Sequence, residues 1–213
     1  MNAQILAQGR DFLRRSPGSR GLLYLGAAVM LFESVGRQFD RRSPNDLLAV
    51  HLIVLPLGVG LTAALRRLEG VSWWQVPPAE GVPQGLAGIG LGAAAFLSVA
   101  GIAASQGWAS APVWGWTETS RTELLQSVAF LAVSHLAVAG NEELVFRGYG
   151  LETLRAAIGP VAAAAVLTAL FALFHERRPQ VLLGQAVTGA TLMVLRLTSG
   201  SLWMPVGYHW AWN

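Results

Sequence analysis

The sequence has no cysteine and no lysine, and it has few charged residues of any kind. Without cysteine, a disulfide, a thiolate metal site and a cysteine nucleophile are all excluded. Only 13% of the 213 residues are charged, against about 25% in typical soluble domains, whereas 53% are hydrophobic. This composition argues against an ordinary soluble domain and indicates a protein embedded in a membrane.

All 15 basic residues are arginine, and they are scattered through the termini and the connections between apolar segments. A nucleic-acid interface needs a basic stripe interleaved with aromatic residues, so nucleic acid is not expected as a partner. Scattered arginines instead contact membrane lipids and orient spanning helices. Their distribution over alternate connections predicts a cytoplasmic N-terminus. Exclusive use of arginine, with abundant Ala and Gly, suggests a bacterial or archaeal cell membrane.

Apolar segments follow one another through most of the chain. The second segment, 47–65, has no charge and would extend about 28 Å as a helix, close to the thickness of the hydrocarbon core. The segment from Gly148 to Gly159 is predicted as a short amphipathic connector. We therefore predict an all-α, polytopic transmembrane helix bundle of about seven spans. The predicted spans are 21–35, 47–65, 85–104, one from Thr122 into the first motif below, 160–175, 180–197, and one starting at 201.

The predicted organisation is a cytoplasmic arm at 1–20 followed by one transmembrane domain at 21–213. The first apolar segment contains Glu33 and lacks a small-residue cleavage site, so it is interpreted as an uncleaved span. Trp73 and Trp74 follow the second span and are predicted to anchor it at the headgroup level. The third span is rich in Gly and Ala, which favours close helix packing.

The sequence GNEELVFRG, at 140–148, places three charges after an uncharged run that begins at Leu124. Glu143 and Arg147 stand at i and i+4 with the acid first, which predicts an ion pair. Glu142 lies about 100° further round the helix and cannot share that arginine equally. One carboxylate is therefore predicted to be structural and the other to be available as a general base. The alternative is that the helix simply leaves the membrane here, where charges are ordinary.

Two later segments add polar residues to apolar surroundings. His175 ends the sequence FALFH, and His209 and Asn213 stand at i and i+4 in HWAWN, hence on one helical face. Singly, each histidine is explained by an interfacial position or a contact between helices. Together with Glu142 they place polar groups on three separate apolar segments, which is expensive in lipid unless they face one another or a water-filled cavity.

Such a set of side chains can hydrolyse a peptide bond. A glutamate takes a proton from water, a histidine relays it, and a His/Asn pair stabilises the oxyanion. The alternative is a divalent metal such as zinc with activated water as the nucleophile, and its ligands would be Glu142, His175 and His209. Strict alternation of spans would direct Glu142 and His175 to opposite faces of the membrane. They meet only if the helix from Pro160 is short, tilted or starts within the membrane.

The order EExxxR, FxxxH, HxxxN on successive apolar segments resembles the CPBP family, also called the Abi or type II CAAX-protease family of intramembrane endopeptidases. The three motifs stand at Glu142–Arg147, Phe171–His175 and His209–Asn213. The resemblance covers the C-terminal part of the chain and implies a protease-like core at 122–213. It also implies that Glu143 and Arg147 hold the site together.

The resemblance assigns roles to four further positions. It implies Glu142 and His175 as proton acceptor and proton donor, and His209 and Asn213 as stabilisers of the transition state. The implied substrate is a membrane protein or a lipid-anchored peptide, and a metal is not required by the mechanism we prefer. Family members usually continue past the last motif, so two alternatives are open: the chain is truncated from eight spans, or Asn213 frays at a chain end and the site is compromised. The alternative function is a non-catalytic membrane protein of the same fold, acting in bacteriocin immunity or as a scaffold.

Other classes of membrane protease fit the sequence less well. HERRP at His175 lacks the second histidine of the HExxH zinc motif, and no Gly-x-Ser-Gly stretch indicates a serine nucleophile. A transporter would be expected to show a matched pair of broken helices, which is not seen. His51 and His135 belong to no motif and are predicted to be structural.

Overall fold

The computed structural model describes residues 11–12, 15–40, 42–71, 78–108 and 119–213, and all regular structure in these ranges is helical. The predicted all-α class is confirmed. The predicted Trp73–Trp74 anchor and most of the N-terminal arm lie outside the described residues. In chain order the elements are α2 (Pro17–Gly36), α3 (Pro44–Glu69), α4 (Pro78–Ser105), α5 (Arg121–Glu143), the π-helical η2 (Leu144–Tyr149), α6 (Gly150–Ile158), α7 (Pro160–Leu173), α8 (Pro179–Ser199) and α9 (Trp203–Trp212).

Local sequence signals set many of the helix ends. Helices α2, α3, α7 and α8 begin with proline, which is tolerated in the first turn because its missing N–H has no helical partner there. Helix α5 begins with a capping box between Ser120 and Glu123. Helices α3 and α8 end at Gly70 and Gly200, whose φ angles of 78° and 71° are left-handed and unstrained only for glycine.

Among the described residues, four helical stretches are long and apolar enough to cross a membrane: Pro44–Glu69, Ala79–Ser105, Arg121–Ile158 and Pro179–Ser199. They contain the second, third, fourth and sixth predicted spans. The other three predicted spans are helical but lack the length or the apolar composition of a full membrane span. Helix α2 carries two charges, α7 has 14 residues and α9 has 10. At 1.5 Å per residue α7 is about 21 Å long, well short of the roughly 30 Å hydrocarbon core.

The fourth span is longer than expected because α5, η2 and α6 form one bent helical rod. Gly148 departs from helical geometry at φ −85° and ψ −122°, and this bends the rod within η2. At Gly150 a side chain would meet the carbonyl oxygen of Val145, so only glycine fits the bend. The predicted connector at 148–159 is helical over Gly150–Ile158 and extends α5, and the chain turns back only at Gly159.

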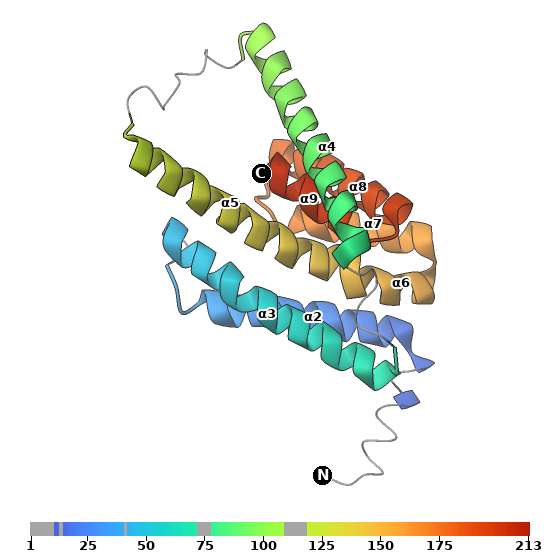
Figure 1. The fold of residues 1–213 in the computed structure, drawn as a ribbon. Helices are drawn as coiled ribbons and strands as arrows, with labels where there is room; N and C mark the ends of the chain where they lie inside the picture. The colour runs from blue at the N-terminus through green and yellow to red at the C-terminus, as the bar shows by residue number, and fades with distance from the viewer. Residues whose placement is uncertain (1–10, 13–14, 41, 72–77, 109–118) are drawn as a thin grey trace.

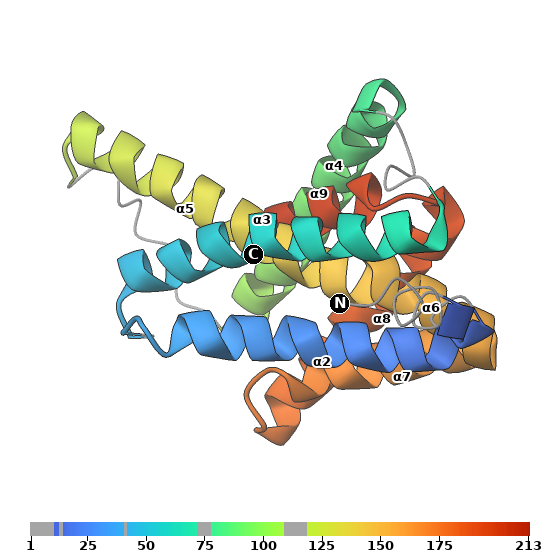
Figure 2. The same ribbon diagram turned by 90° about the horizontal axis from the view of Figure 1, so that it is seen from below.

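Helices α2 and α3 lie side by side in both views, with α5 next to α3 (Figures 1 and 2). Helix α7 packs against α8 and against α6 at the end of the bent rod. An apolar core lies among η2, α6, α7 and α8. It comprises Phe146, Leu151, Leu154, Ala163, Leu167, Phe171, Leu192 and Met193.

Helix α9 is held against α4 by a glycine-lined face. Side chains at Gly88 or Gly92 would run into the backbone of α9 at Met204 or Tyr208, and one at Gly207 would run into the backbone of α4. The two backbones therefore touch, as the Gly- and Ala-rich composition of α4 predicted. Figure 1 shows α4 crossing α9 and running beyond it. Since α9 carries His209, this packing sets the position of a predicted site residue.

Candidate active site

The predicted ion pair between Glu143 and Arg147 is present and completely buried. Arg147 donates from Nη1 to Glu143 Oε1 at 3.1 Å, and both side chains have 0% exposure. The same guanidinium donates from Nη2 to the carbonyl of Gly189 on α8 at 3.0 Å. Its carbon lies 4.3 Å from the centre of the Phe171 ring on α7. Arg147 thus joins three elements around the site by charge, hydrogen bond and cation–π contact.

The Glu142 carboxylate is not part of the ion pair with Arg147 and lies near the imidazole rings of two histidines. Its Oε2 lies 3.8 Å from His209 Nε2 and 4.0 Å from His175 Nε2. These distances are too long for direct hydrogen bonds, but one water molecule can bridge each of them. Glu142 Oε2 is buried and has no hydrogen-bond partner. The predicted convergence of polar groups from three segments is therefore present for Glu142, His175 and His209.

Both imidazoles are oriented by a bond at Nδ1. His175 Nδ1 lies 2.8 Å from the carbonyl of Phe171, and His209 Nδ1 lies 2.9 Å from Glu143 Oε1. A carbonyl or a carboxylate only accepts, so both Nδ1 atoms carry hydrogen. In each ring Nε2 is the atom left to face Glu142, and the protonation of Nε2 can change during a reaction.

Glu143 therefore has a second partner that the sequence did not predict. Its Oε1 accepts from both Arg147 and His209, so one carboxylate holds two cationic or potentially cationic groups. The opposite charges of Glu143 and Arg147 offset one another where both side chains are buried, which lowers the cost of burying them.

The length of the bent rod explains how Glu142 and His175 meet. From Glu142 to Ile158 the rod runs outward for 16 residues, about 24 Å at 1.5 Å per residue. After the turn at Gly159, α7 returns over 14 residues, about 21 Å, and His175 follows two residues after its end. The outward and returning lengths are nearly equal, so His175 lies at about the same height along the rod as Glu142. This is the short-helix case among those expected from the sequence.

Asn213 follows α9 one turn after His209 and is exposed. Its backbone N–H donates to the carbonyl of His209 at 3.1 Å, which continues the helix to this residue. The spacing keeps Asn213 on the His209 side of α9, as predicted. Its role in stabilising a transition state stays a prediction.

The predicted metal ligands Glu142, His175 and His209 suit zinc by their donor atoms. Each histidine also has the Nδ1 bond to an acceptor that commonly orients metal-binding imidazoles. Across the described ranges, however, no three His, Asp or Glu side chains are arranged to hold a metal ion. The participation of a metal stays a prediction for experiment.

One residue next to the site was not predicted. Asn141 is buried, and its amide nitrogen lies 2.9 Å from the carbonyl of His51, 3.0 Å from that of Ala137 and 3.2 Å from His51 Nδ1. It ties α5 to α3 immediately before Glu142. The sequence feature that could have identified Asn141 is a polar amide at the end of an uncharged apolar run. His51, predicted to be structural, is its buried partner.

Fold and site together define an all-helical membrane protein with a buried glutamate–histidine cluster where three helical segments meet. Residues 124–213, which contain all three motifs, match the family model described as Type II CAAX prenyl endopeptidase Rce1-like. The predicted resemblance to the CPBP family is confirmed over this part of the chain, and the matched family is one of proteases. No curated protein and no solved structure matches the chain.

Proposed function

We propose that this protein is an intramembrane endopeptidase in which Glu142 activates water to hydrolyse a peptide bond. The substrate would be a membrane protein or a lipid-anchored peptide. The observation that carries the proposal is the buried, unpartnered Oε2 of Glu142, with two imidazole Nε2 atoms at 3.8 and 4.0 Å. The match of this segment to a family of proteases supports the same reading.

In the proposed reaction a water molecule sits between Glu142 and His175. Glu142 takes one proton as the water oxygen bonds to the peptide carbonyl carbon. When the carbon–nitrogen bond breaks, this proton passes to the leaving amine with the help of His175 Nε2. The other water proton stays on the new acid group, so the products are one carboxylic acid and one amine, and no oxidant or reductant is needed.

His209 would stabilise the oxyanion formed after the attack. An imidazolium at His209 can donate from Nε2 while Glu143 accepts from Nδ1 at 2.9 Å and balances its charge. The packing of α9 on α4 keeps this donor in place before the substrate arrives. Asn213, on the same side of α9, would add a second donor.

The exposure of the side chains indicates how substrate and water approach. Glu142 and His175 are 23% and 26% exposed, whereas His209 is 4% exposed. Water and peptide would therefore enter on the side of Glu142 and His175, with His209 forming the back of the site.

The test is cleavage of a prenylated CAAX reporter peptide by the purified protein in liposomes. Glu142→Gln should lower the cleavage rate by about 10²–10⁴-fold, the usual worth of a general base. Glu80→Gln, which changes an exposed glutamate in the first turn of α4, should cleave like the wild type. Equal cleavage by Glu142→Gln and wild type would refute the catalytic role. The inactive variant also serves to trap native substrates by crosslinking in membranes.

A further inference from the structure

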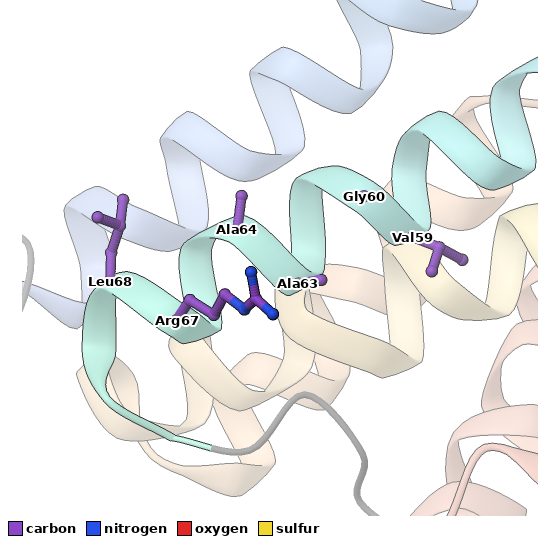
Figure 3. A pocket seen from close by; sticks show the side chains of 6 residues that line it. All are labelled: Val59, Gly60, Ala63, Ala64, Arg67 and Leu68. Atoms are coloured by element: carbon purple, nitrogen blue, oxygen red, sulfur yellow. The ribbon is translucent and has the colours of Figure 1, made fainter.

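Helix α3 has a groove whose lining includes none of the candidate site residues. It has a volume of about 690 Å³, and Figure 3 shows that its side chains come from successive turns of this one helix. Gly60, Ala64 and Arg67 are exposed within it. The lining residues are Val59, Gly60, Ala63, Ala64, Arg67 and Leu68.

The helix segment that lines the groove has about the length of the hydrocarbon part of one membrane leaflet. From Val59 to Leu68 the helix rises over nine residues, about 14 Å, which is about half of the hydrocarbon core. Its far end lies beside the end of the span at Glu69, and Val59 lies near the middle of the span Pro44–Glu69. Small residues in its centre leave room for a chain of methylene groups.

A cation stands at the headgroup end. The two neighbouring arginines are used differently, because Arg66 pairs with Glu152 while Arg67 stays exposed. The Arg67 side chain lies along the groove toward Ala63 (Figure 3), and it forms no ion pair with any residue in the described ranges. An unpaired guanidinium beside hydrocarbon is costly, and a phosphate satisfies its planar donors well.

We propose that this groove binds one anionic phospholipid. Arg67 holds the phosphate at the headgroup level, and one acyl chain lies over Gly60, Ala63 and Ala64. Both parts of the groove are needed, because the arginine selects an anionic headgroup and the small residues leave room for the acyl chain. The site is independent of the proposed peptide hydrolysis.

The experiment measures lipid retention by the full chain in detergent. Native mass spectrometry compares phosphatidylglycerol with phosphatidylcholine of the same acyl chains. The wild type should retain phosphatidylglycerol preferentially. Arg67→Gln should weaken its binding about fivefold, the effect of one arginine near anionic lipid, and abolish the preference. Arg42→Gln, an exposed arginine before the opposite end of α3, should behave like the wild type.

A second variant tests the groove itself. Gly60→Leu should reduce retention of both lipids by filling the groove, and the fold should survive because a Cβ atom at Gly60 would meet nothing within 4 Å. Gly26→Leu, equally unobstructed but on α2, is the matched control and should change nothing. The proposal is overturned if Arg67→Gln keeps the wild-type preference, or if Gly60→Leu binds both lipids as the wild type does.

Discussion

The same substitution at the two adjacent glutamates of the first motif is expected to lower the stability strongly at Glu143 and only slightly at Glu142. Glu143 is completely buried, and its Oε1 is shared by Arg147 and His209. Glu143→Gln removes the charge and leaves the Arg147 guanidinium buried without its counterion. Loss of one partner from a buried pair typically costs about 3–5 kcal/mol. We therefore expect a large fall in thermal stability, with cleavage lost because His209 also loses its partner.

Glu142→Gln should leave the fold intact. Its Oε2 accepts no hydrogen bond, and the amide has nearly the same shape. We expect a stability change within about 1 kcal/mol, as for substitutions that break no partnered group, together with the loss of cleavage. The difference in unfolding free energy between the two variants should be at least about 2 kcal/mol.

The measurement is thermal unfolding of both variants in detergent, followed by helix content, with reporter cleavage assayed in parallel. Glu80→Gln controls for the loss of one carboxylate on the surface. The reasoning is refuted if Glu143→Gln is as stable as Glu142→Gln, because the buried pair would then not be a main support of the site.

Three further predictions concern the surroundings of the site. Exhaustive chelation should leave cleavage unchanged if Glu142 activates water directly; activity lost on chelation and restored by zinc would establish the metal alternative. Asn141→Leu should lower the stability by about 1–3 kcal/mol, because the carbonyl of His51 loses its donor in a buried position, and hydrogen exchange should rise in α3. Gly88→Ala should cost about 1–3 kcal/mol and lower the rate of cleavage, because its methyl group would push against the backbone of α9. Its control, Gly90→Ala, meets nothing within 4 Å and should melt like the wild type.

The amino-acid sequence determined the features that depend on local spacing and composition. A low share of charge and repeated apolar segments were enough to predict an all-α membrane protein. The pair of Glu143 and Arg147 was predictable because residues four apart on a helix are neighbours whatever the rest of the chain does. The same rule placed His209 and Asn213 on one side of α9.

Only the tertiary structure decided which distant groups meet. Glu142 and His175 come together because the rod continues past Gly148 to Ile158 before it turns, and no short-range pattern specifies that balance of outward and returning lengths. The bond between Glu143 and His209 depends on α9 packing against α4, backbone to backbone. A contact between residues 66 positions apart requires several helices to pack correctly at once, so local periodicity cannot specify it.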